Sequence, residues 1–299
     1  MSPRPASSVT RRRFLLGGGA AAGAVLLGAC GDDDAGGGTT TTVAPTGDLS
    51  LVQFFGGLPM LVAGGPVRAP FGLADTEDLL PVDRTPETIT ISLTGPDGSS
   101  HGEPIEVPRH AEGLPRAYFP LQFTAGDPGI YTGRTEIDGA ALEMAIKIDP
   151  AEDVGVVKPG DPMPAIATPT TADAQGVDPV CTSDPACPLH DVTVTEALEA
   201  GRPLGLLVAT PAFCQISICG PVLDVLLAVA DDHPGVQLVH AEVYAHPQED
   251  LEVKAAVVDA LGLTFEPCLV LVGSDGSVVE RLDTIFDEVE VDEALSRLT

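Results

Sequence analysis

Residues 213–224, FCQISICGPVLD, decide the fold because they mark the place where a buried strand gives way to a helix. The apolar run 204–210 in front of them is typical of a strand that is buried on both faces. The apolar residues in 222–230, after the stretch, recur at the helical period. The sequence therefore predicts a strand, a short connection that carries two cysteines, and a helix.

The two cysteines, Cys214 and Cys219, lie five positions apart. In a regular helix their Cα atoms would be roughly 8–9 Å apart, beyond the limit of about 7 Å for a disulfide. Pro221 predicts a helix that begins near Ile218 or Cys219, because proline is tolerated in a first turn and clashes in an interior one. We therefore place Cys214 in a loop before the helix. A disulfide is then possible, and the helix dipole would stabilise a thiolate.

The rest of the C-terminal half alternates strands and helices. We expect a strand at 236–244, a helix at 251–261, a hairpin with strands at 268–272 and 277–282, and a closing helix at 287–298. Together with the strand and helix around the cysteines, this order predicts an α/β domain over residues 188–299.

This order resembles that of the thioredoxin fold, and the resemblance covers residues 155–299. The segments ATPAFCQISICGPVLD, VHAEVY and FEPCLVLVGSDG look similar to those of thioredoxin-like proteins found among exported actinobacterial lipoproteins. The resemblance implies that Cys214 is the attacking thiol, that Cys219 is the resolving thiol, and that Pro267 is a cis-proline beside them.

Three residues depart from the thioredoxin pattern. Phe213 stands where that family usually has tryptophan, and Val208 stands where it buries an acid that assists proton transfer. Glu266 precedes the proline, and a carboxylate near a thiol raises the thiol pKa. A register that matches Cys219-Gly220 to the start of a C-G-P-C motif would leave a site with one cysteine.

The N-terminus predicts export and lipidation. Residues 1–29 contain Arg11, Arg12 and Arg13 before a short apolar run, as in a twin-arginine signal peptide. The run ends in LGAC, which resembles a lipobox and makes Cys30 the expected lipidation site. Residues 30–48 have the composition of a flexible tether. We therefore expect a lipid-anchored protein of the cell membrane that faces the extracytoplasmic side.

Residues 49–150 predict an all-β domain. Short alternating segments such as 88–94 are separated by turn residues, and Asp138-Gly139 is expected to close a hairpin. We interpret this part as an immunoglobulin-like sandwich, in which His101 and His110 are exposed. Residues 151–187, rich in Pro, Asp and Thr, are interpreted as a linker that leads into the second domain.

The charge restricts the partners. The chain is strongly acidic, with a net charge of −29, and removal of the arginine-containing signal would make it more so. Such a surface repels nucleic acid and anionic lipid. We therefore expect no nucleic-acid partner, and we expect attachment to the membrane through the lipid alone.

The remaining cysteines are assigned by their spacing. Cys181 and Cys187 lie in one short loop, so a structural disulfide is the default in an oxidising compartment. With Cys214 also paired to Cys219, Cys268 is left over.

Three functions are consistent with these residues. The first is a thiol-disulfide oxidoreductase that acts through Cys214 and Cys219 on exported protein thiols or a redox partner. The second is a structural or binding lipoprotein in which this pair is a permanent staple. The third is a copper chaperone, for which His190, His240 and His246 are available. Outside this third hypothesis, we expect no cofactor and no metal site.

Overall fold

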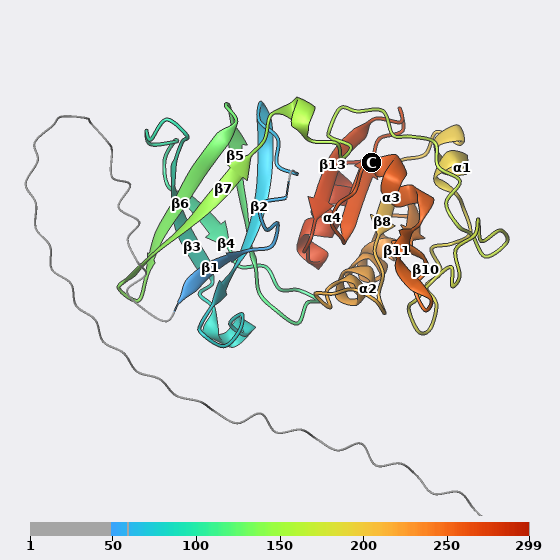
Figure 1. The fold of residues 1–299 in the computed structure, drawn as a ribbon, viewed down its shortest axis with the longest axis horizontal. Helices are drawn as coiled ribbons and strands as arrows, with labels where there is room; N and C mark the ends of the chain where they lie inside the picture. Colours follow the sequence, from blue (N-terminus) through green and yellow to red (C-terminus); the bar gives the residue numbers. More distant parts are fainter. Residues whose placement is uncertain (1–48, 59, 299) are drawn as a thin grey trace, which may run out of the picture. The chain divides into compact units, whose positions relative to one another are not determined.

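The computed structural model describes residues 49–58 and 60–298. These residues form a mixed α/β structure with mostly antiparallel sheets and few helices (Figure 1). The expected signal peptide, the lipidation site Cys30 and the tether lie outside the described residues. Among the described helices, none combines the length and the apolar character needed to cross a membrane.

Two antiparallel sheets make up the N-terminal part. Alternate residues of the strands are buried, as in β7, where every second side chain faces the core. Residues of both sheets, such as Phe71, Phe119, Ile91 and Ile146, share one hydrophobic cluster. One sheet has the order β1 (Ser50–Gln53), β2 (Gly65–Ala74), β5 (Phe119–Ala125); the other has the order β4 (Ile105–Pro108), β3 (Thr88–Thr94), β6 (Gly129–Ile137), β7 (Ala140–Ile148).

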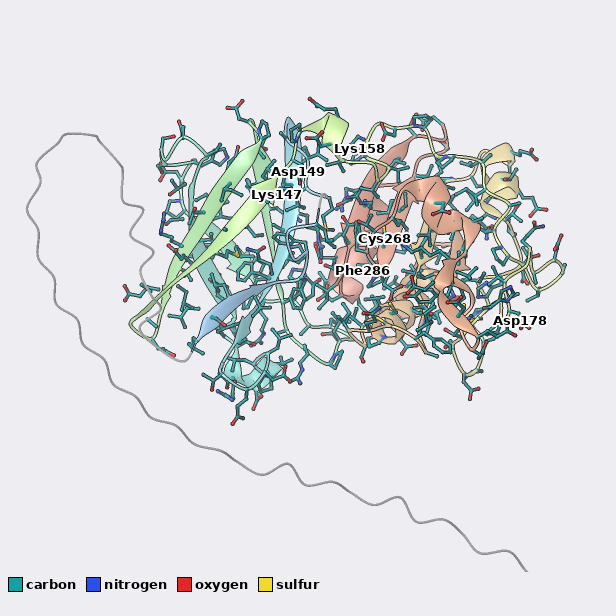
Figure 2. The ribbon with its side chains drawn as sticks, viewed as in Figure 1. Lys147, Asp149, Lys158, Asp178, Cys268 and Phe286 are labelled. Atoms are coloured by element: carbon teal, nitrogen blue, oxygen red, sulfur yellow. The ribbon has the colours of Figure 1, made fainter. Side chains whose placement is uncertain are left out.

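The hairpin between β6 and β7 confirms the prediction made from Asp138-Gly139. Ile137 pairs with Ala140, so the loop has two residues, and both have positive φ angles, 51° and 78°. Such a turn matches the twist of the flanking strands. At the far end of β7, Lys147 forms an ion pair of 2.6 Å with Asp149 (Figure 2).

A four-stranded sheet with helices on both faces makes up the C-terminal part. β8 runs parallel to β9, and the other neighbours are antiparallel. β8 and β12 are buried throughout. One face of the sheet packs in a cluster with residues of α1 and α3, and the other face packs with residues of α2 and α4. The sheet order is β13 (Val278–Asp283), β12 (Cys268–Val272), β8 (Leu204–Val208), β9 (Gln237–Ala241); the helices are α1 (Val194–Glu199), α2 (Cys219–Val229), α3 (Ala256–Leu261) and α4 (Glu288–Ser296).

Most of the C-terminal elements agree with the prediction. The helix predicted at 251–261 was wrong in its first half. Residues 251–254 belong to β11, which pairs with β10, and the helix α3 begins only at Ala256. Leu251 and Val253 are exposed on this hairpin, so their spacing reflected a strand at the surface and not a helix that faces the core. The remaining short elements are β10 (Tyr244–His246), β11 (Asp250–Lys254) and the 3-10 helices η1 (Val82–Arg84), η2 (Ala151–Asp153) and η3 (Ala230–Asp232).

Two further features were missed. Helix α1 has a capping box between Thr193 and Glu196, a signal that the sequence carries. Residues 154–187, interpreted as part of a linker, contain no strand, but several of their apolar side chains are buried in the core of the C-terminal part. Val156, Met163 and Ile166 are among them.

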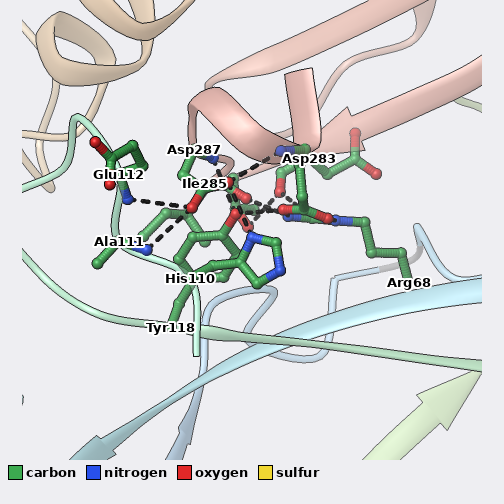
Figure 3. A network of polar contacts seen from close by, with 10 residues as sticks. Arg68, His110, Ala111, Glu112, Tyr118, Asp283, Ile285 and Asp287 are labelled. Carbon is green, nitrogen blue, oxygen red and sulfur yellow. Dashed lines mark hydrogen bonds and ion pairs between the residues drawn. The ribbon is translucent and has the colours of Figure 1, made fainter. Parts of the chain in front are cut away.

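A buried polar network connects β2 with α4. Arg68 donates to both carboxylate oxygens of Glu290, at 2.8 and 2.6 Å, and to the carbonyl oxygens of Asp283 and Ile285 (Figure 3). Tyr118 also donates to Glu290. Burial and the Glu290 charge raise the pKa of Tyr118, so the phenol keeps its proton. The Glu290 carboxylate is therefore satisfied by a guanidinium and a phenol.

His110 belongs to the same network, which corrects the expectation that it is exposed. Its Nδ1 lies 2.9 Å from Asp287, the N-cap of α4, and its side chain is 15 % exposed. Burial alone would lower the pKa of His110, but the hydrogen bond with Asp287 raises it overall. His101 is also only partly exposed, and its ring packs edge-on against Tyr131.

Replacement of Arg68 by methionine should lower the free energy of unfolding by about 3–5 kcal/mol, because the Glu290 carboxylate is left buried without its cation. Arg134→Met is the matched control. It breaks an exposed pair with Glu143 and should cost less than about 1 kcal/mol. Urea denaturation of the full chain measures both. Equal losses in the free energy of unfolding for the two variants would contradict a stabilising role of the buried network.

Candidate functional site

Three strand ends meet at one edge of the C-terminal sheet. Val208, the last residue of β8, pairs with Ala241 of β9 and with Cys268 of β12. The residues that follow Val208 and Ala241 and those that precede Cys268 therefore lie at the same edge. They include Cys214 with Cys219, the acid Glu242, and Glu266 with Pro267.

Cys214 lies outside α2 and Cys219 opens it, as the position of Pro221 predicted. Ile218 is the N-cap residue of the helix, and Ser217 has a positive φ of 56° in the connecting loop. The backbone N–H groups of Ile218 and Cys219 face the Cys214 sulfur closely enough to lower its pKa. Cys219 is fully buried, whereas Cys214 is partly exposed. The two thiols thus have different access to solvent.

The two thiols also differ in acidity. A hydrogen bond from the Cys219 thiol lowers the pKa of Cys214 to about 5; burial opposes this, and the backbone N–H groups add to it. The hydrogen bond to Cys214, together with burial, raises the pKa of Cys219. At neutral pH the reduced site therefore holds a thiolate at Cys214 and a protonated thiol at Cys219.

Glu266 lies beside the two thiols. One of its carboxylate oxygens and the two sulfur atoms all lie within 4.8 Å of one another. Burial, together with the negative charges of Cys214 and Glu242, raises the pKa of Glu266 to about 7. The carboxyl group can therefore take up or release a proton near neutral pH. The bond between Glu266 and Pro267 is cis, as the resemblance implied.

Glu242 is a buried acid that sequence reasoning missed. It is fully buried just after β9, where its Oε1 accepts the backbone N–H of Thr182 at 2.6 Å. Burial raises its pKa. The thioredoxin family buries an acid at the position of Val208, on β8, whereas this chain places one at the end of the neighbouring strand. The lone acid in the apolar segment VHAEVY was the available signal.

A second group contains Cys181, Cys187, His190 and His240. One ligand atom of each lies within 4.8 Å of the others. His190 and His240 are thus beside this cysteine pair, whereas the group around Cys214 and Cys219 contains Glu266. The third histidine of the copper hypothesis, His246, lies on β10.

All five cysteines of the described residues are free thiols. Cys214 hydrogen-bonds with Cys219, and Cys181 lies beside Cys187, so each pair of the expected disulfides is brought together in its reduced form. The two disulfides themselves stay predictions. Cys268, labelled in Figure 2, is fully buried 3.4 Å from an Asp283 oxygen, and burial raises its pKa. It is not a reactive thiol.

Comparison with known proteins assigns the chain to no family. No protein-family model matches the chain, and no curated protein matches it significantly.

Alkylation of the reduced chain should reveal the acidity of Cys214. Its rate of reaction with iodoacetamide should rise as the pH increases through about 5 and be maximal at neutral pH, because the thiolate is the reactive form. Cys219→Ala removes the hydrogen-bond donor and should move the midpoint upward. Mass spectrometry of the labelled peptides measures each rate, with buried Cys268 as the unreactive internal control. A midpoint near the ordinary cysteine value of about 8.5 would contradict this assignment.

Proposed function

We propose that the protein is a membrane-tethered, extracytoplasmic thiol-disulfide oxidoreductase in which Cys214 is the nucleophile and Cys219 is the resolving thiol. The observation that carries the proposal is the difference between the two thiols. Cys214 is accessible and its pKa is lowered to about 5, whereas Cys219 is buried and its pKa is raised. A redox-active thiol pair needs one thiol that attacks the partner disulfide and a second thiol that releases the partner.

The arrangement of the strands supports a thioredoxin-like fold for the C-terminal part. The order β13, β12, β8, β9, with only β8 and β9 parallel, is what the resemblance implies, and α2 follows the central strand. In the N-terminal part, two antiparallel sheets with a common core support an immunoglobulin-like sandwich. We propose both folds on these grounds.

The reaction follows from the two thiols. The Cys214 thiolate attacks one sulfur of a partner disulfide; an S–S bond forms to Cys214, and the partner's other sulfur leaves as a thiolate and takes up a proton. Cys219 then loses its proton, for which the carboxylate of Glu266 is the nearby acceptor. Its thiolate attacks the Cys214 sulfur. The partner leaves as a dithiol, reduced by two electrons, and a Cys214–Cys219 disulfide remains. A disulfide in this site oxidises a partner dithiol by the reverse steps.

The expected location supports a protein substrate. The proposed twin-arginine signal and lipidation at Cys30 would place the site among exported proteins, whose cysteines need oxidation or rearrangement. Ile216, two residues after Cys214, is 60 % exposed and offers an apolar contact to a polypeptide. The net charge of −29 argues against a nucleic-acid partner.

A structural role for the same pair is the second candidate, since Cys219 is fully buried and a disulfide there would have one protected sulfur. Such a staple would resist reduction, and the protein would then be a binding or scaffold lipoprotein.

Substitution of the two cysteines separates these roles. Cys214→Ser should abolish the reduction of insulin by the full chain in the presence of dithiothreitol, because the nucleophile is lost. Cys219→Ser should instead accumulate a mixed disulfide between Cys214 and the substrate, visible on a non-reducing gel. Cys268→Ala is the matched control, since it removes a buried thiol outside the site, and it should keep the activity. A wild-type chain that is inert would favour the staple.

A further inference from the structure

Four side chains that bind metals in other proteins converge beside the thiol site, and the proposed redox reaction uses none of them. Cys181, Cys187 and His190 come from the loop before α1, and His240 comes from β9. The backbone N–H of His240 donates to Leu189 of the loop at 3.0 Å, so the loop is attached to the strand at this point. Cys187, His190 and His240 are buried, and Cys181 is partly buried.

Four distances between the ligand atoms of this group are close to those in a tetrahedral zinc site. A tetrahedral zinc site with ordinary bond lengths places two nitrogen ligands about 3.3 Å apart, nitrogen and sulfur about 3.6 Å apart, and two sulfurs about 3.8 Å apart. The distance from His190 Nε2 to His240 Nδ1 is 3.2 Å. Cys187 Sγ lies 3.3 Å from His190 Nε2 and 3.4 Å from His240 Nδ1, and Cys181 Sγ lies 3.9 Å from His240 Nδ1.

The orientation of His240 also suits a ligand. Its Nε2 lies 3.1 Å from the carbonyl oxygen of Ala209, which can only accept a hydrogen bond, so the ring proton belongs on Nε2. Nδ1 then directs its lone pair at the two sulfurs and at His190. A metal-binding histidine typically donates its other N–H to such a group, which holds the ring in place.

A disulfide explains less of this arrangement. It would join the sulfurs of Cys181 and Cys187 and would leave His190 Nε2 and His240 Nδ1, 3.2 Å apart, paired only with each other. The approach of both ring nitrogens to Cys187 Sγ, at 3.3 and 3.4 Å, would then have no role. A cation at this point would bind both thiolates and both rings.

We propose that Cys181, Cys187, His190 and His240 bind one Zn²⁺ ion in a closed tetrahedral site that joins the loop 181–190 to β9. Two thiolates and two neutral imidazoles are a common ligand set for zinc, and four protein ligands leave no position for a substrate, as in structural sites. This proposal departs from our expectation of a disulfide in this loop and of no metal site.

Zinc binding tests the proposal directly. The full chain, reduced and freed of metal with a chelator, should take up one equivalent of Zn²⁺ in competition with a chromophoric chelator. With Co²⁺ as the probe, it should show the intense visible bands of tetrahedral cobalt and the ultraviolet bands of thiolate ligands. His240→Ala should weaken the binding at least about a hundredfold. The double variant Cys214→Ser, Cys219→Ser is the control and should still bind one equivalent.

Protection of the wild-type thiols keeps the test independent of whether a variant folds. Zn²⁺ should slow the alkylation of Cys181 and Cys187 and leave that of Cys214 unchanged. The proposal is overturned if the reduced chain binds no Zn²⁺, if the cobalt spectrum is octahedral, or if binding is lost in the Cys214 and Cys219 control. A Cys181–Cys187 disulfide in protein isolated from its own compartment without reductant would overturn it as well.

Discussion

The register of three strands is the constraint on which the site depends. Val208 of β8 lies between Ala241 of β9 and Cys268 of β12, and β8 and β9 run in the same direction. The chain therefore leaves two strands and enters a third at one edge of a buried sheet. The sheet itself has no polar side chains on β8 or β12 apart from the Cys268 thiol, so the polar chemistry gathers where these strands end.

Glu242 connects the two cysteine groups at this edge. It accepts the N–H of Thr182, which lies next to Cys181, and the hydroxyl of Thr182 accepts the N–H of Ala212 at 3.2 Å, two residues before Cys214. The Glu242 charge also raises the pKa of Glu266, after the effects of burial and of Cys214. A zinc ion in the loop would hold Thr182, and through it Glu242, in place. The proposed structural site and the proposed redox site would then depend on one buried carboxylate.

The sequence predicted those parts of the fold that follow from local rules. Pro221 places the start of α2, and Asp138-Gly139 places a hairpin turn, because each residue type restricts its own backbone. The group of Cys181, Cys187, His190 and His240 could not be found this way, since fifty positions separate its two histidines and only the pairing of β9 with the loop brings them together. Glu242 was missed for a related reason: its burial depends on neighbouring segments. Residues 251–254 were misassigned because Leu251 and Val253 were counted with the apolar residues of α3, although they are exposed on a small hairpin.

The reduction potential of the Cys214–Cys219 pair tests this account most directly. The full chain is equilibrated with redox buffers of known potential, the thiols are trapped by alkylation, and the oxidised fraction of this pair is read by mass spectrometry. A thiolate stabilised at Cys214 favours the reduced form, so the account predicts a potential well above about −300 mV, in the range of catalytic pairs. A potential below about −300 mV would show a permanent staple and would contradict the proposed oxidoreductase.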